Sequence, residues 1–306
     1  GMCGPSDRSE SIATIHAAVD AGITLIDTGD FYGMGHNEML IGDALKQGSK
    51  RDKAVLSVKF GGQRGPDGHW LGYATDRNAT RTALAYTLKR LRVDYIDIYR
   101  PARVSPLVPI EDTVGAIAEL VKEGYVRHIG LSEAGADTIR KAHAVHPIVD
   151  LQIEYAILTR GVEDKILPVL RELGIGMTAY GVLSRGLISD SALAGGSRSG
   201  FRAMAPRFQG ENLDQNLKLV SALKAIADEK GCTVAQLAMA WVYAQGEDIV
   251  PLIGARKPAR LAEALGALYV TLTPADMARI EAAAPASAVA GTRYPAALIP
   301  TLDSER

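Results

Sequence analysis

The stretch AGITLIDTGDFYGMGHNEMLIGDAL, residues 21–45, contains one complete strand, loop and helix. Its apolar part, ITLIDTG (23–29), predicts a buried strand that ends in polar residues and a glycine. An amphipathic segment follows at 37–47 and predicts a helix. The same alternation recurs along the 306 residues, and it is typical of parallel βαβ units.

The predicted strands are short runs of apolar and β-branched residues at 23–29, 54–61, 95–101, 126–132, 149–155, 174–181 and 248–254. The helices predicted around them lie at 9–21, 37–47, 77–92, 110–124, 135–145 and 163–173, with a longer pair within 213–246. Two connections, 62–76 and 184–212, are longer than a barrel requires. Because long loops beyond strand ends usually cover a site, we expect both near the functional site.

Two α/β folds fit this alternation, a doubly wound sheet and a (β/α)8 barrel. The glycine fingerprint of dinucleotide-binding doubly wound sheets, G-x-G-x-x-G, does not follow the first predicted strand. Polar residues instead lie at or just beyond the ends of many strands: Asp27, Lys59, Arg100, Ser132, Gln152, Tyr180 and Arg256. Because a barrel brings all strand ends around one mouth, we predict a single barrel domain over residues 1–306.

The composition, with 47% hydrophobic and 23% charged residues, is that of an ordinary globular protein. The 34 basic and 35 acidic residues nearly cancel, so we expect neither a nucleic acid nor a membrane as a partner. The two cysteines, Cys3 and Cys232, form no disulfide or zinc pattern and indicate a cytoplasmic protein. The six histidines do not pair with strand-end carboxylates at metal-ligand spacing, so we expect no metal.

Three residues predict proton chemistry when they are taken together. Taken singly, Asp27 is typical of a turn or cap, Tyr32 of packing, and Lys59 of a rim lysine that reaches solvent. An ammonium beside a phenol stabilises the phenolate, so Lys59 would lower the pKa of Tyr32, and Asp27 would keep Lys59 charged and oriented. Tyr32 would then donate a proton to a carbonyl oxygen on which negative charge develops.

Several stretches share their order and spacing with one enzyme family: residues 21–45, VLSVKFG (55–61), GYVRHIGLSE (124–133), LQIEY (151–155), AYGVLSRGLIS (179–189) and PLIGARKPARLAEAL (251–265). In these stretches the chain resembles the aldo-keto reductases along nearly its whole length. The resemblance implies a (β/α)8 barrel and the reduction of a small-molecule carbonyl with NADPH. It also implies that Asp27, Tyr32 and Lys59 are three members of a catalytic tetrad.

The fourth member of that tetrad departs from the family pattern. A histidine should close the stretch YIDIYRPARVSP (95–106), but its position is Ala102. Arg100 and Arg103 are candidate replacements, because a guanidinium carries five donors and stays charged. We predict Arg103 as the replacement, and the alternative for each arginine is an ion pair with a surface carboxylate.

A second departure is the strand that family members have before the helix at 9–21. We expect this first strand to be missing or truncated, with residues 1–3 as its remnant. Its absence would leave the strands at 23–29 and 248–254 with unpaired edges.

Cofactor binding is predicted from the segment that follows the last strand. Three cations, Arg256, Lys257 and Arg260, surround the start of a helix there. A helix N-terminus attracts phosphate and arginine binds a 2′-phosphate in bidentate geometry, so the segment favours NADPH over NADH. The further cofactor-binding residues implied by the resemblance are Ser132 and Gln152 at the carboxamide, Tyr180 stacked on the nicotinamide, Ser184, Arg185 and Gly186 at the diphosphate, and Gly254 and Glu263 towards the adenine end. The residue after Ser132, commonly Asn in the family, is Glu133.

The predicted function is therefore that of an NADPH-dependent oxidoreductase that reduces an aldehyde or ketone. The PAR sequence at 101–103 resembles an atypical branch that includes pyridoxal reductases, so pyridoxal or another aromatic aldehyde is the expected substrate. The alternative is a non-catalytic or slow NADPH-binding sensor or regulatory subunit, since the family also resembles channel-associated β subunits. The missing histidine favours the sensor, whereas retention of Asp27, Tyr32 and Lys59 favours the enzyme.

Overall fold

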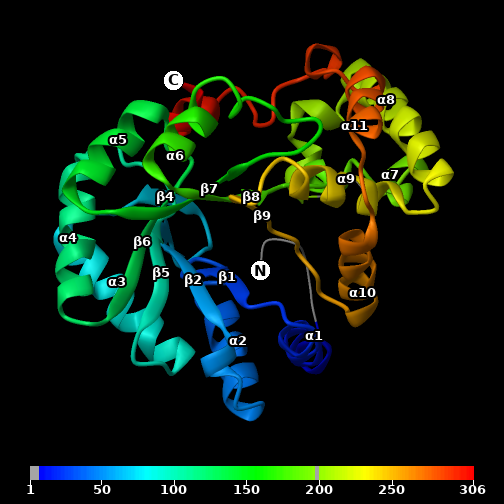
Figure 1. Cartoon of the computed structure of the whole chain (residues 1–306). Coiled ribbons are helices and arrows are strands. Elements are labelled where there is room, and N and C mark those ends of the chain that lie inside the picture. The colour runs from blue at the N-terminus through cyan, green and yellow to red at the C-terminus, as the bar shows by residue number, and fades with distance from the viewer. Residues whose placement is uncertain (1–6, 197–199) are drawn as a thin grey trace.

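Seven parallel strands form the main sheet of the protein (Figure 1). The computed structural model describes residues 7–196 and 200–306. In the order in which they lie side by side, the strands are β1 (Leu25–Gly29), β2 (Val55–Phe60), β5 (Ile96–Pro101), β6 (Val126–Ser132), β7 (Ile148–Glu154), β8 (Gly176–Tyr180) and β9 (Ile249–Pro251). Each predicted strand contains or overlaps one of these seven.

Helices alternate with the strands along the chain, as the sequence predicts. They are α1 (Arg8–Asp20), α2 (His36–Gln47), α3 (Arg77–Leu91), α4 (Ile110–Lys122), α5 (Ala136–Val145), α6 (Ile166–Leu173), α7 (Asp190–Leu193), α8 (Gly210–Glu229), α9 (Val234–Tyr243), α10 (Pro258–Gly266) and α11 (Pro274–Ala283). Figure 1 shows α3, α4 and α5 along the outer side of the curved sheet. None of the described helices combines the length and the apolar character needed to cross a membrane.

Helix α4 illustrates why these segments fold onto the sheet. Its buried residues Ile110, Val114 and Ile117 recur at spacings of four and three, which places them on one face of a helix. That face packs against β6, and Val114 and Ile117 are completely buried. Burying each such side chain contributes about 1.5–3 kcal/mol, so the apolar stripe fixes the helix on the outer side of the sheet.

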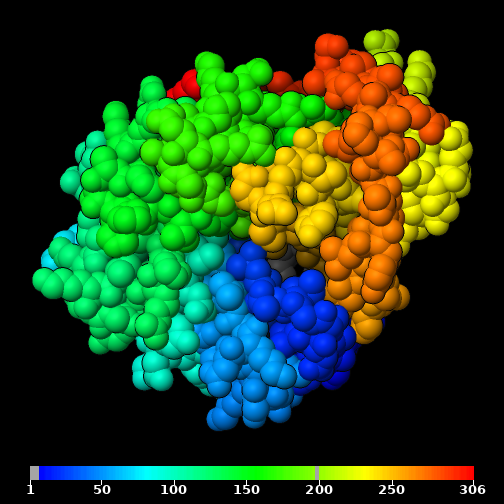
Figure 2. All heavy atoms as spheres, in the orientation of Figure 1, coloured from blue at the N-terminus to red at the C-terminus, as the bar shows by residue number. Residues whose placement is uncertain are grey.

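The sheet is open between β1 and β9 in the described part of the chain, because each of these strands pairs with a single neighbour. Helix α1 packs against α10 beside this opening. Figure 2 shows the two helices next to each other, in dark blue and orange. The unpaired edges expected at strands 23–29 and 248–254 are thus present, whereas the predicted remnant of a first strand lies outside the described residues.

An antiparallel hairpin, β3 (Gly62–Arg64) and β4 (Trp70–Tyr73), occupies a connection that the sequence predicts only as a long loop. Glycines and a proline interrupt its apolar pattern, so periodicity does not reveal the two strands. The Trp70 ring meets Phe31 edge to face, with 5.6 Å between the ring centroids. The hairpin therefore covers the loop that follows β1.

Candidate active site

Strand register places the predicted catalytic residues side by side at the carboxyl ends of the strands, which we call the mouth. Asp27 on β1 pairs with Ser57 on β2, and Gly29 pairs with Lys59 two residues further on. Tyr32 follows in the loop after β1, where its backbone N–H donates to the Gly29 carbonyl at 3.0 Å. Two side chains that are 32 positions apart in the chain, those of Asp27 and Lys59, thereby come into contact.

Asp27 and Lys59 form a buried ion pair, with side chains that are 7% and 5% exposed. Ser57 donates its hydroxyl to Asp27 Oδ1 at 3.1 Å, and Gln152 on β7 donates its amide to the same oxygen at 2.7 Å. The carboxylate therefore has three partners and holds the ammonium in one position. Lys59 is not the solvent-exposed rim lysine of the alternative interpretation.

Tyr32 lies next to this ion pair. Lys59 Nζ is 5.1 Å from the centroid of the Tyr32 ring, and Phe31 packs edge to face against that ring at 4.9 Å. Burial raises the pKa of the Tyr32 phenol and the charge of Lys59 lowers it, with a net shift upward. The sequence indicates the effect of Lys59 but not the larger effect of burial. Tyr32 is therefore a neutral phenol at pH 7, with a proton to donate.

Arg100 is completely buried and forms an ion pair with Asp150, in which Nη1 is 2.5 Å from Oδ2. Its Nη2 donates to Ser57 Oγ at 2.8 Å, so polar contacts run from Asp150 through Arg100 and Ser57 to Asp27. Gly130 leaves room for this guanidinium, because a Cβ there would lie 3.3 Å from Arg100 Cζ. The ion pair considered for this arginine exists, but its partner is a buried carboxylate and not a surface one.

Arg103 lies beyond the end of β5, close enough for its charge to act on Tyr32. Burial raises the pKa of the Tyr32 phenol, whereas the charge of Arg103 lowers it, as does the charge of Lys59. Arg103 Nη1 donates to the Ala102 carbonyl at 2.6 Å and Nη2 donates to the Tyr294 hydroxyl at 3.3 Å. Its Nε is buried without a hydrogen-bond partner, and no carboxylate within the described ranges forms an ion pair with it. A guanidinium with an unused N–H thus lies near the phenol.

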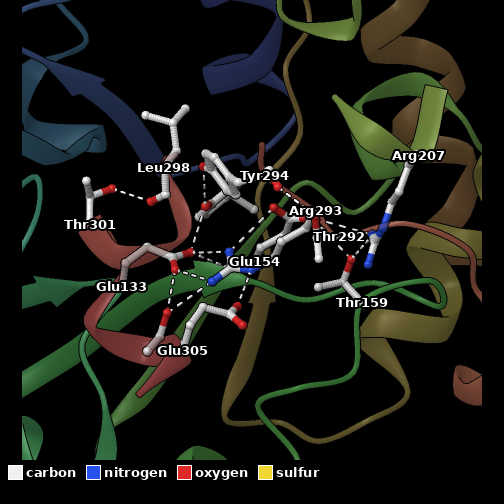
Figure 3. A network of polar contacts seen from close by, with 12 residues as sticks. Glu133, Glu154, Thr159, Arg207, Thr292, Arg293, Tyr294, Leu298, Thr301 and Glu305 are labelled. Atoms are coloured by element: carbon white, nitrogen blue, oxygen red, sulfur yellow. Dashed lines mark hydrogen bonds and ion pairs between the residues drawn. The ribbon is translucent and has the colours of Figure 1, made fainter. Parts of the chain in front are cut away.

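The loop after β6 carries a carboxylate that joins the mouth to the C-terminal segment, residues 285–306. Glu133 is completely buried, and Arg293 donates to its two oxygens at 2.9 and 2.5 Å (Figure 3). Ser304 Oγ donates to the same carboxylate at 2.7 Å, and the Tyr180 hydroxyl does so at 2.6 Å. Burial alone would raise the pKa of Glu133, but the hydrogen bonds and charge of Arg293 lower it to about 2.

The C-terminal segment also brings Tyr294 to the mouth, as Figure 3 shows. The Tyr294 hydroxyl lies 3.0 Å from that of Tyr180, and Arg185 Cζ is 4.6 Å from the centroid of the Tyr294 ring. The sequence does not predict this residue, because the stretch around it, AGTRYPAALIPTL (290–302), has neither periodicity nor a motif.

Comparisons with known proteins identify the family of this chain. A sequence model described as the aldo/keto reductase family matches residues 1–285. The chain belongs to this family. It is 45% identical over 294 residues to a protein of Glycine max described as probable aldo-keto reductase 1, with 95% of this chain and 84% of that relative covered. The protein is thus an oxidoreductase of the type that reduces carbonyl groups, and members of the family generally use NADH or NADPH.

Solved aldo/keto reductases share the fold of this chain. The glycerol dehydrogenase of Gluconobacter oxydans superposes with a TM-score of 0.82 at 27% identity, covering 94% of this chain and 89% of its own. An aldo-keto reductase of Bacillus halodurans, in its holo form, gives a TM-score of 0.76 at 26% identity, with 93% and 90% covered. The predicted (β/α)8-barrel fold class is therefore confirmed.

In this aldo/keto reductase the residues expected at the nicotinamide lie at the ends of β6, β7 and β8. Ser132 pairs with Gln152 in the strand register, and both side chains are buried. Because the Gln152 amide donates to Asp27, a residue expected at the carboxamide is linked to the ion pair. The Tyr180 hydroxyl is held by Glu133, so the position of its ring is fixed.

The turn expected at the diphosphate has an unusual backbone. Ser184, Arg185 and Gly186 have φ angles of 46°, 59° and 87°, all in the left-handed region. For the two non-glycine residues this costs on the order of 1 kcal/mol each, and such strain concentrates at ligand sites. Ser184 Oγ is buried without a hydrogen-bond partner in the described part of the chain. An unused hydroxyl on a turn of this shape fits an anionic diphosphate, although the Arg185 guanidinium itself pairs with Glu154 at 3.4 Å.

The segment expected at the adenosine end leads into α10. The helix begins at Pro258, directly after the exposed Arg256 and Lys257, and Lys257 at its N-cap forms no side-chain cap bond. A Cβ at Gly254 would meet no atom within 4 Å, so the backbone borders open space there. These features fit a phosphate-bearing ligand at the start of the helix.

Arg260 and Glu263, also expected at this end, pair with each other. Arg260 Nη1 is 2.6 Å from Glu263 Oε2, and the other carboxylate oxygen accepts from the Thr233 hydroxyl at 3.3 Å. Arg260 is largely exposed, so its head group can turn towards a ligand without losing burial.

No group of three His, Cys, Asp or Glu side chains within residues 7–196 and 200–306 could hold a metal ion. Cys232 is a free thiol there, whereas Cys3 lies outside the described residues.

Proposed function

We propose that this protein reduces the carbonyl group of a small aldehyde or ketone with NADPH. The observation that carries the proposal is the position of the Tyr32 ring beside the buried pair of Asp27 and Lys59. Ala102 at the place of the tetrad histidine supports membership of the branch that resembles pyridoxal reductases. Pyridoxal or another aromatic aldehyde is the proposed substrate, and the cysteine usage supports the cytoplasm as the compartment.

The reduced nicotinamide, when bound, supplies a hydride to the carbonyl carbon. Tyr32 donates its proton to the carbonyl oxygen as negative charge develops there. The ammonium of Lys59, held in position by Asp27, stabilises the phenolate that remains on Tyr32. Because the pair is shielded from water, this attraction is stronger than it would be at the surface.

Arg103 takes the role of the absent histidine in this proposal. Its charge acts on the Tyr32 phenol, and no carboxylate in the described part of the chain lies within ion-pair distance of it, so the guanidinium can interact with the carbonyl oxygen. Its permanent charge would stabilise the developing alkoxide as well as orient the substrate. Arg100 does not fit this role, because its guanidinium is completely buried and its charge is already paired with the carboxylate of Asp150.

The proposed NADPH site follows the strand ends from β6 to α10. The 2′-phosphate of NADPH would interact with the cations around the start of α10, which NADH cannot do. The residues that would bind the cofactor are Ser132, Gln152 and Tyr180 at the nicotinamide, Ser184, Arg185 and Gly186 at the diphosphate, and Gly254, Arg256, Lys257, Arg260 and Glu263 around the adenosine and its 2′-phosphate.

Stopped-flow mixing of the NADPH-loaded protein with a panel of aldehydes, beginning with pyridoxal, tests the proposal. We expect NADPH oxidation with at least one aldehyde, and a rate about 10²–10⁴-fold lower in Tyr32→Phe, because that variant lacks only the acidic proton. Affinity for NADPH should change by less than about twofold, since the ring remains. Tyr269→Phe, at a tyrosine that is 88% exposed, is the matched control and should behave as wild type.

NADPH fluorescence that persists with every carbonyl compound would contradict the reductase and favour the sensor. The same protein should bind NADPH at least about tenfold more tightly than NADH, because the 2′-phosphate adds charge-assisted hydrogen bonds. Equal affinities in a fluorescence titration would contradict the proposed cofactor preference.

A further inference from the structure

The Tyr294 hydroxyl lies where Arg103 and Tyr180 meet. Arg103 Nη2 donates to it at 3.3 Å, and Tyr180 Oη lies 3.0 Å away. The residue is only 9% exposed, and Phe201 packs against its ring edge to face at 5.5 Å. Among the side chains of residues 7–196 and 200–306, the Tyr294 hydroxyl is the one that accepts a hydrogen bond from Arg103.

The residue before Tyr294 anchors it. Arg293 is 8% exposed, donates to both oxygens of Glu133, and donates through Nε to Glu305 Oε1 at 2.6 Å. Because these charges are removed from water, their hydrogen bonds are strong and hold the backbone at residue 293. Thr292 Oγ1 also donates to the Tyr294 carbonyl at 2.7 Å. The backbone of Tyr294 is therefore held at the preceding residue, Arg293, and at its own carbonyl.

Arg103 requires such an anchor. An arginine side chain carries about 2 kcal/mol of rotamer entropy, which must be overcome before its donors point in one direction. The other hydrogen bond of Arg103 goes to the carbonyl of its own neighbour Ala102, and no described carboxylate pairs with it. Without the Tyr294 hydroxyl, the guanidinium would keep no hydrogen bond to a described side chain.

We infer that Tyr294 is a positioning residue: its hydroxyl holds the Arg103 guanidinium near Tyr32, so that Arg103 donates to the carbonyl oxygen of the substrate. The inference rests on the proposed function, in which Arg103 replaces the tetrad histidine. It makes the C-terminal segment part of the machinery that orients the carbonyl, through a residue that acts on another side chain.

A double-mutant cycle on Tyr294 and Arg103 tests this. Tyr294→Phe removes one oxygen and keeps the ring, so we expect kcat to fall about tenfold while the affinity for NADPH changes by less than about twofold. In an Arg103→Met background, Tyr294→Phe should change kcat by less than about twofold, because the group that it positions is gone. Tyr243→Phe, at a tyrosine that is 61% exposed, is the matched control.

Rates measured under single-turnover conditions include variants that are too slow for steady-state assays, so all four corners of the cycle can be compared. Circular dichroism verifies that each variant is folded. If the fold-loss of kcat in the double variant equals the product of the losses in the two single variants, the two residues act independently and the inference is overturned. A parallel loss of NADPH affinity in Tyr294→Phe would also overturn it, because that loss would indicate that Tyr294 acts on Tyr180 instead. A wild-type protein that reduces no carbonyl contradicts the proposed function itself, whereas an active wild type with multiplying losses contradicts this inference alone.

Discussion

Two buried polar networks meet at the mouth of this barrel, and they are built in different ways. The inner network joins residues on strands β1, β2, β5 and β7: Asp27, Ser57, Lys59, Arg100 and Asp150. Parallel register places Asp27, Ser57, Lys59 and Arg100 on the adjacent strands β1, β2 and β5. The Arg100 side chain reaches past β6 to Asp150 on β7.

The outer network joins Glu133, in the loop after β6, to Arg293, Ser304 and Glu305. Glu133 and Arg293 are 160 positions apart, and Glu133 has a left-handed backbone with φ of 54°. No strand register specifies this contact, so it depends on the packing of irregular segments. The sheet thus positions Asp27 and Lys59, whereas the contact between Glu133 and Arg293 depends on charge pairing between residues far apart in the sequence.

The largest expected effect comes from breaking the inner network at Lys59. Lys59→Met leaves the Asp27 carboxylate buried without its counter-charge and Tyr32 without a cation. We expect turnover to fall at least about 10³-fold and the free energy of unfolding to fall by about 3–5 kcal/mol, measured by single-turnover kinetics and urea unfolding.

The double variant Asp27→Asn with Lys59→Met is the matched control, since it removes both charges. Part of the lost stability should return, but none of the turnover. Recovery of turnover in this variant would show that the ion pair has only a structural role.

A smaller effect, with a distinct pH signature, is expected from the outer network. Because the pKa of Glu133 is lowered from 4.5 to about 2 in the folded protein, its ionised form stabilises the fold above pH 4.5, and this contribution is lost as the pH falls towards 2. The shift corresponds to on the order of 3 kcal/mol. In urea unfolding, Glu133→Gln should lose about that amount at pH 7 and less than half of it at pH 3. A difference from wild type that is equal at both pH values would contradict the assignment.

The smallest effect is expected at Ser57, because the residues that it joins each have a second polar partner. Ser57→Ala removes the hydroxyl between Asp27 and Arg100, but each of these keeps another charged partner. We expect a loss of about 1–2 kcal/mol in unfolding free energy and a fall in turnover of less than about tenfold. A fall as large as that in Lys59→Met would mean that the contact through Ser57 controls the ion pair.

The sequence predicts three members of the inner network, Asp27, Lys59 and Arg100, because they interrupt apolar strands, but it does not predict Ser57 or Asp150. Lys59 and Arg100 each follow an apolar run at a strand end, and a charge in such a place needs a partner. Burial is the part that the sequence does not supply. The pKa of Tyr32 is therefore raised and not lowered overall, and Arg100 pairs with a buried carboxylate instead of a surface one.

The outer network and the hairpin cannot be predicted in the same way. Arg293 and Tyr294 lie in a segment without hydrophobic periodicity or a motif. The sequence around Arg293 also does not indicate that its partner is a carboxylate 160 positions earlier. Glu133 differs from the residue common in the family, which marks it as a departure but does not identify its partner. Strands β3 and β4 each contain a glycine and are joined by a turn with Gly65, Pro66 and Gly68, so the local pattern favours a loop.

The separation of 160 residues between Glu133 and Arg293 also determines the order in which the two ion pairs can form during synthesis of the chain. Chain synthesis adds about 5–20 residues per second, so about 8–30 s elapse between the appearance of the carboxylate and that of its guanidinium. During this interval Glu133 remains an ordinary hydrated acid. The nascent polypeptide can thus assemble its ion pair of Asp27 and Lys59 early, whereas Glu133 gains its partner only after residue 293 has been added.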